Sequence, residues 1–164
     1  MLVAVERNGP VRATPVTSDK IAELSPQLDR FVDKQAHLMT DENHSYQSIG
    51  RQHAAHDWVN HSQKEYARGE VHNNTAESFS AILERAKQGV FHYLSTQHLR
   101  RYLNEIGFRW DHRIAEPKLT RNGDLKIVMK PMPVIKMFRS LLFRAQGRQL
   151  RRSANGGFRC LEPL

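Results

Sequence analysis

Apolar and polar residues alternate along the first third of the chain in periods that predict short strands separated by helices. Valine-rich runs at residues 2–5 and 11–16 flank Asn8-Gly9-Pro10, a pattern typical of a β-hairpin closed by a Gly-containing turn. Apolar residues at helical spacing then predict an amphipathic helix over residues 20–34, with Pro26 inside it. This segment therefore begins as a hairpin followed by a helix.

A short apolar run over residues 37–40 stops at two carboxylates, Asp41 and Glu42. The run predicts a buried strand that delivers an acidic side chain to its carboxyl end. A small helix over residues 45–52 and a brief strand over residues 58–61 are expected next. A turn acid exposed to solvent is the alternative interpretation of Asp41, and Glu42 is expected at the surface.

Two well-patterned helices follow. Asn74 precedes Glu77 by three residues, the spacing of a helix N-cap and its capping-box partner, and Gly89 is expected to end that helix. Ser95 or Thr96 is expected to cap the next helix. The capping box is thus one reading of Glu77, and a ligand role is the other.

The chain changes character after Pro117. Residues 118–130 are rich in turn formers around one expected strand at residues 125–129, and Pro133 opens an apolar helical stripe. We predict a division into residues 1–113 and a basic extension over residues 114–164.

Composition narrows the class. The 164 residues are 39% hydrophobic and 26% charged, which is typical of one globular domain. No window approaches the ~18 consecutive apolar residues of a membrane span, and the N-terminus lacks a secretory pattern. A single cysteine, Cys160, points to a reducing cytoplasm. We therefore expect a cytoplasmic protein with no membrane partner.

The net charge of +8 is concentrated in one part of the chain. Residues 1–112 contain 13 Lys and Arg against 14 Asp and Glu, whereas residues 113–164 contain 12 against three. The first part is near neutral at −1 and the second is at +9. Such a basic segment fits a polyanion, with nucleic acid the commonest candidate, or a basic face that serves solubility alone.

Asp41 and Glu77 could also act together. A carboxylate at the end of a strand and another in the first turn of a later helix can converge on one divalent cation, because Mg²⁺ and Mn²⁺ prefer oxygen ligands. Such a site supports phosphodiester cleavage and strand transfer.

Local motifs across nearly the whole chain make the chemistry more specific. Together they resemble the insertion-sequence transposases of the ISXO-like DDE type. The motifs are Val5-Glu6-Arg7-Asn8-Gly9, Thr40-Asp41-Glu42 with Tyr46, Val59-Asn60-His61-Ser62 with Glu65-Tyr66, His72-Asn73-Asn74-Thr75 with Glu77-Ser78-Phe79, His98-Leu99 with Arg101-Tyr102-Leu103 and Glu105, Phe108-Arg109 with Arg113, and Gly147-Arg148 to Arg152 with Gly156-Gly157.

The resemblance implies an RNase H-like catalytic domain, an α/β fold with a mixed sheet and flanking helices, that cuts and joins DNA with Mg²⁺ or Mn²⁺. Asp41 matches the second acid of the family's triad, Glu77 matches the third, and Asn74 falls in the same motif. Candidate DNA contacts complete the set: His61, His72, Arg85, Lys87, Arg148, Arg151 and Arg152. The implied partners are double-stranded DNA, at element ends and target, and a homo-oligomer or complementing transposase subunit.

The family places its first acid on a central strand before the Glu6-Arg7-Asn8-Gly9 hairpin motif, and this chain starts inside that hairpin. Without that strand, we expect two unpaired strand edges that face each other. We also expect the chain to be a truncated remnant that is inactive as a transposase. The basic C-terminal tail is expected to be helical. A non-catalytic basic nucleic-acid-binding protein and a stand-alone RNase H-like nuclease are the alternatives.

Overall fold

A computed structural model of the chain divides into two compact units, Met1–Asp111 and His112–Leu164. The structure describes residues 1–63, 65, 67–146, 149–152 and 158–161, with side chains up to residue 146. The expected contacts at Arg148 lie outside these residues.

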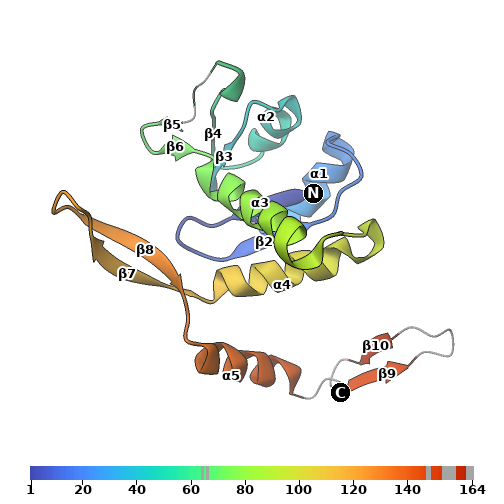
Figure 1. Ribbon diagram of the computed structural model, residues 1–164. Helices are drawn as coiled ribbons and strands as arrows, with labels where there is room; N and C mark the ends of the chain where they lie inside the picture. The colour runs from blue at the N-terminus through green and yellow to red at the C-terminus, as the bar shows by residue number, and fades with distance from the viewer. Residues whose placement is uncertain (64, 66, 147–148, 153–157, 162–164) are drawn as a thin grey trace. The chain divides into compact units, whose positions relative to one another are not determined.

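The first unit alternates short strands with helices (Figure 1). Its elements are β1 (Leu2–Val5), β2 (Val11–Thr14), α1 (Ile21–Phe31), β3 (His37–Thr40), α2 (His44–Gly50), β4 (Ala55–Trp58), the 3-10 turn η1 (His61–Gln63), β5 (Ala67–Arg68), β6 (Val71–His72), α3 (Asn74–Ala86), the π-helical turn η2 (Lys87–Phe91), the 3-10 turn η3 (Thr96–His98) and α4 (Leu99–Asp111).

The expected hairpin is confirmed. β1 and β2 pair antiparallel, with Leu2 opposite Thr14 and Val5 opposite Val11. The turn holds Asn8 at a positive φ of 59°, a conformation that asparagine tolerates better than most residues.

The strand that ends before Asp41 is also confirmed. β3 pairs in parallel with β4, with His37 opposite Ala55 and Thr40 opposite Trp58. The intervening helix α2 makes the crossover that a parallel pair requires. The brief strand expected over residues 58–61 is shifted, because β4 ends at Trp58 and the chain then turns into η1.

The strands do not join into one mixed sheet within the described residues. They form separate two-stranded sheets, with β1 paired only to β2 and β3 only to β4. A groove of about 1020 Å³ is lined along one side by β1 and along the other by β3. Within the described residues no strand pairs with both β1 and β3, so the expectation of two strand edges facing each other stays a prediction.

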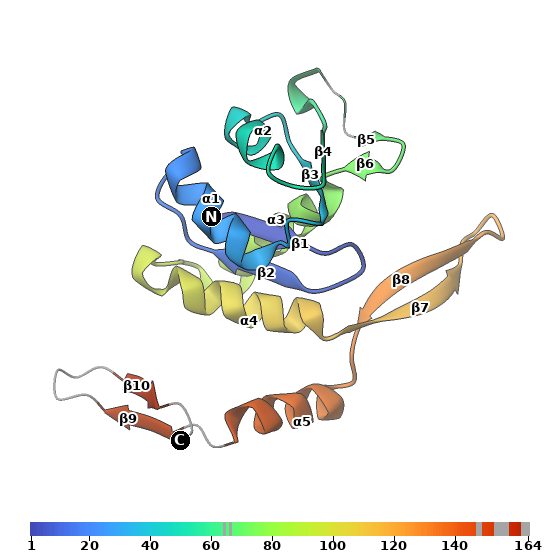
Figure 2. The same ribbon diagram turned by 180° about the vertical axis from the view of Figure 1, so that it is seen from behind.

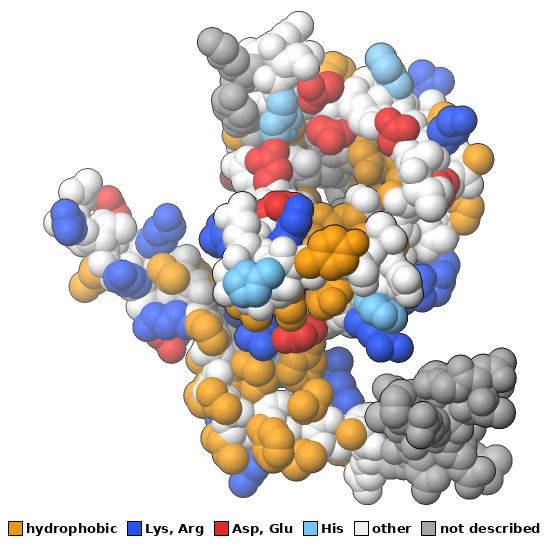
Figure 3. All heavy atoms as spheres, turned by 45° about the vertical axis from the view of Figure 1, so that its right-hand side comes forward, with side chains coloured by type: hydrophobic (Ala, Val, Ile, Leu, Met, Phe, Trp, Pro, Cys, Tyr) orange, Lys and Arg blue, Asp and Glu red, His pale blue; other side chains and the backbone are white. Residues whose placement is uncertain are grey.

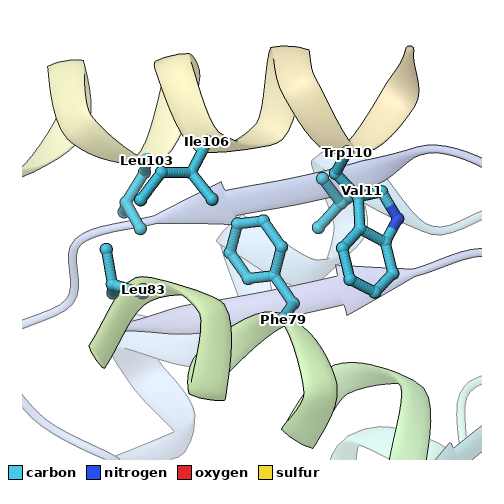
Figure 4. Close-up of a cluster of buried hydrophobic side chains, with 6 residues drawn as sticks. All are labelled: Val11, Phe79, Leu83, Leu103, Ile106 and Trp110. Atoms are coloured by element: carbon cyan, nitrogen blue, oxygen red, sulfur yellow. The ribbon is translucent and has the colours of Figure 1, made fainter. Parts of the chain in front are cut away.

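Two hydrophobic clusters lie on opposite faces of the hairpin. The first, cluster one, joins β2 to α3 and α4 through Val11, Phe79, Leu83, Leu103, Ile106 and Trp110 (Figure 4). The second, cluster two, joins β1 and β3 to α1 and α2 through Leu2, Leu24, Leu28, Leu38 and Ile49. The view from behind in Figure 2 shows α1 on the opposite side of the hairpin from α4.

Helix boundaries differ from the sequence prediction in two places. α1 continues through Pro26 and ends at Phe31, so this proline does not end the helix although it lies past the first turn and donates no backbone hydrogen bond. α3 ends at Ala86, and Gly89 lies inside the π-helical turn that follows rather than at the helix end.

The second unit contains more strand than the helical tail expected from the sequence. Its elements are β7 (Arg113–Leu119), β8 (Leu125–Pro131), α5 (Val134–Ala145), β9 (Gln149–Arg152) and β10 (Phe158–Leu161). Only β8 and α5 were predicted. β7 was missed because Pro117 and three charged residues mask its period-2 pattern.

We predict that Phe79→Ala destabilises the first unit by about 3–5 kcal/mol, because the side chain is fully buried and meets Trp110 edge-on at a centroid distance of 5.6 Å. The control Phe143→Ala removes a ring that is 78% exposed and should change stability by less than about 0.5 kcal/mol. Urea unfolding followed by circular dichroism checks both variants, and equal effects would contradict the assigned core.

Candidate functional site

Asp41 and Glu77 lie together in one small pocket. The pocket has a volume of about 280 Å³ and is lined by Asp41, Glu42, Asn43, His61 and Glu77. Asp41 follows β3 directly, and Glu77 lies in the first turn of α3. The structure therefore brings together two acids that are far apart in the sequence.

The end of β3 is fixed by buried polar contacts. The Thr40 hydroxyl lies 3.0 Å from His56 Nε2 and donates to the Asp41 carbonyl oxygen at 2.9 Å. The His56 ring fits against Gly50, where a Cβ atom would come within 2.1 Å of it. Burial lowers the pKa of His56, which favours the neutral form of the ring beside the Thr40 hydroxyl. These contacts set the backbone from which Asp41 projects.

Asp41 also shapes the turn after the strand. Its Oδ1 accepts from the Asn43 backbone N–H at 3.1 Å, and the Asn43 side chain caps α2 by accepting from the Ser45 N–H at 2.9 Å. Burial, reinforced by the negative charge of Asp41, raises the pKa of Tyr46. Asp41 is thus an anchored, partly buried acid rather than a freely solvated turn residue.

The capping box predicted for α3 is not formed. The N-cap residue is Asn73, one position earlier than expected, and no side chain closes a cap hydrogen bond. Glu77 instead places Oε1 3.3 Å from His61 Nδ1, and its side chain is 48% exposed. Asn74 is the first residue of α3 and is exposed, three residues before Glu77. Its side chain lines neither this pocket nor the groove.

Glu42 has a specific role that the sequence did not predict. Its carboxylate accepts from the backbone N–H groups of His61 and Ser62 at 3.1 and 3.2 Å, and from the Ser62 hydroxyl at 2.8 Å. The pKa of Glu42 is lowered to about 2 by its own backbone N–H, the Ser62 hydroxyl and the His61 N–H. Glu42 therefore ties η1 to the end of β3 and holds His61 beside Glu77. In the sequence, only the adjacent acidic pair Asp41-Glu42 pointed to this role of Glu42.

His72 lies close by but in the larger groove. It belongs to β6, and its buried Nδ1 atom has no hydrogen-bond partner among the described residues. Asn73, Thr75, Ala76 and Glu77 line the same groove, which brings Glu77 to the border of both cavities.

The predicted cationic contacts are more scattered. Arg85 and Lys87 are exposed near the end of α3, and Lys87 lies 3.9 Å from Glu84. Arg151 and Arg152 belong to β9, whose side chains are outside the described part, as is Arg148. These residues are not brought to the pocket of Asp41 and Glu77 by any described contact.

The donor set suits a hard divalent cation. Within the described residues no group of three or more His, Cys, Asp and Glu side chains is arranged to hold a metal. Mg²⁺ is often held by one or two carboxylates, with water and substrate phosphates as its other ligands, so two acids at one pocket fit that mode of binding.

None of the described helices has the length and apolarity to span a membrane.

Comparison with known proteins covers the whole first unit. The family model for the ISXO2-like transposase domain matches residues 1–111. No curated protein and no solved structure matches the chain significantly. The matched residues include β1 through α4, with Asp41, His61 and Glu77 among them. The chain therefore belongs to the family of ISXO2-like transposase domains.

Proposed function

We propose that residues 1–111 form part of a DDE-type catalytic centre for DNA transposition, in which Asp41 and Glu77 hold Mg²⁺ or Mn²⁺ together with DNA phosphates. The observation that supports this most directly is the shared pocket: two acids from separate elements line it, and His61 lies against one of them. When bound, the metal would activate a water or hydroxyl nucleophile and stabilise the leaving oxygen.

The chain's own residues prepare this pocket. Glu42 fixes the η1 backbone, and η1 places His61 3.3 Å from the Glu77 carboxylate. A histidine in contact with a ligating carboxylate orients it, as outer-sphere partners commonly do. Asn74 lies one turn before Glu77 on the same face of α3, so we assign its amide to substrate or water near the metal. His72 borders the groove and is assigned to the DNA backbone.

We further propose that the complete domain is RNase H-like and that one more strand lies between β1 and β3. Support comes from the groove, which both strands line with edges that no described strand pairs. Leu28, Phe31 and Val32 line its α1 side, and Ala76 and Ser80 line its α3 side. An extended segment would meet apolar residues on one face and small residues on the other, whether a complementing subunit or another segment supplies it.

The remaining acid of the pocket is already engaged. Glu42 is committed to the η1 hydrogen bonds, so Asp41 and Glu77 are the acids with capacity for a metal. A two-metal mechanism with three acids therefore requires a carboxylate from outside this pocket. We infer that the 164-residue chain binds a divalent cation but does not cleave DNA alone.

We predict that Asp41→Asn and Glu77→Gln each weaken Mn²⁺ binding by about tenfold or more, because each removes one charged oxygen ligand. Glu84→Gln, two turns further along the same helix, is the control and should bind Mn²⁺ like the unaltered chain. Isothermal titration calorimetry measures all three. Equal affinity for the Glu77 and Glu84 variants would refute the assignment.

We predict that the 164-residue protein shows no Mg²⁺- or Mn²⁺-dependent cleavage of DNA carrying insertion-sequence ends, because two acids are too few for the reaction. A gel assay with end-labelled duplex measures this. Metal-dependent cleavage that Asp41→Ala abolishes would overturn the inference that the chain is inactive alone, while leaving the metal assignment standing.

We predict that the link between η1 and β3 loosens in acid. The pKa of Glu42 is about 2, below its ordinary value of 4.5, so the stabilisation is complete above about pH 4.5 and is lost as the pH falls toward 2. Glu42→Gln should remove the pH dependence, whereas Glu105→Gln on α4 should keep it. NMR of the His61 and Ser62 amides provides the readout, and an unchanged acid transition in Glu42→Gln would exclude this origin.

A further inference from the structure

The second unit contains a long two-stranded ribbon that the family match does not cover. β7 and β8 pair antiparallel over seven residues each, from Arg113 opposite Pro131 to Leu119 opposite Leu125. The turn between them holds Gly123 at a φ of 86°, and Thr120 N–H and Asp124 O are 2.9 Å apart across it. Figure 1 shows this ribbon as a twisted pair of strands, and no third described strand pairs with it.

The two faces of the ribbon differ in chemistry. Side chains alternate between faces along a strand, and residues directly opposite share a face. Leu119, Leu125 and Ile127 lie on the apolar face and are 67%, 71% and 66% exposed. Lys118 and Lys126 lie on the other face, directly opposite each other. In Figure 3 the ribbon shows Lys and Arg side chains among apolar ones.

The pairing of Lys118 with Lys126 is electrostatically unfavourable by itself. Like charges directly opposite each other on a ribbon destabilise it. Further along the same face Lys130 is in contact with Glu116, so that charge is compensated. Neither Lys118 nor Lys126 makes an ion pair with a carboxylate in the described residues, and both are exposed. The charged face thus has two adjacent, exposed cations that can bind an external anion.

We propose that the charged face of the β7–β8 ribbon is a DNA-backbone contact, in which Lys118 and Lys126 bind phosphates of duplex DNA. The described side chains of residues 113–146 include eight Lys and Arg and two acids, Glu116 and Asp124, so the surroundings favour an extended anion. A two-stranded ribbon also fits the major groove, which is about 12 Å wide. The choice of DNA among polyanions rests on the proposed function.

An anionic lipid surface fits the ribbon less well. A segment bound at a membrane buries its apolar face and keeps its cations at the same boundary, beside the headgroups. Here Lys118 and Lys126 point away from the face of Leu119, Leu125 and Ile127. With the apolar face in the bilayer, these two charges would be directed into water.

The test is the salt dependence of binding to a 20-base-pair duplex of arbitrary sequence, measured by fluorescence anisotropy in EDTA. Each lysine–phosphate contact contributes about 0.9 to the slope of log K against log salt. The double variant Lys118→Gln, Lys126→Gln should therefore lower the slope by about 2. The charge-retaining double variant Lys118→Arg, Lys126→Arg should keep the full slope.

The matched control removes the same charge elsewhere: Lys20→Gln with Arg30→Gln, at α1 of the first unit, should change the slope by less than about 0.5. Equal losses in the ribbon and control variants would overturn the proposal. So would loss in the Arg variant, or binding of the wild-type chain to phosphatidylserine vesicles but not to DNA.

The outcome is independent of the metal site, because EDTA removes divalent ions. If the lysine-to-glutamine ribbon variant loses about 2 from the slope but the chain does not bind Mn²⁺, only the catalytic proposal is rejected. If the chain binds Mn²⁺ but the ribbon variant keeps the full slope, only the ribbon proposal is rejected.

Discussion

The burial of Phe79 is the constraint on which the geometry of the candidate site depends. Its ring is fully buried between β2 and α4, where it meets Val11 and Trp110. An α-helix advances about 100° per residue, so a side chain two positions earlier lies on nearly the opposite side of the helix. Packing Phe79 inward therefore turns Glu77 outward into the pocket, and the same contact that stabilises α3 also aims its carboxylate.

Asp41 reaches the pocket from the other cluster. Leu38 packs against α1 and α2, while Thr40 is held by the His56 ring, and the chain leaves β3 at Asp41. The two acids are thus fixed by separate sets of apolar contacts. Glu42 connects them, because its hydrogen bonds hold the turn that carries His61 to Glu77. A site assembled in this way is sensitive to the relative position of the two clusters.

Sequence patterns predicted the parts of the site that depend on local structure. The apolar run before Asp41 and the helix carrying Glu77 were both readable, because burial on one face imposes a period of two or 3.6 residues. The capping box was wrong because the N-cap is Asn73, which puts Glu77 at the fourth helical position instead of the third, beside His61. The role of Glu42 was missed because its hydrogen-bond partners are remote in sequence, whereas β7 was missed because Pro117 and three charged residues mask its pattern.

The groove between β1 and β3 also has a consequence for how the domain unfolds. No pairing between the described strands crosses it. The two hydrophobic clusters share β1 as their common strand, with Leu2 in one cluster and Val3 and Val5 against the other. Cooperative unfolding requires that the unfolding of one region destabilise the regions packed against it. We therefore expect the region from α1 to β4, which meets the hairpin through Leu2, to open more readily than the part held by cluster one.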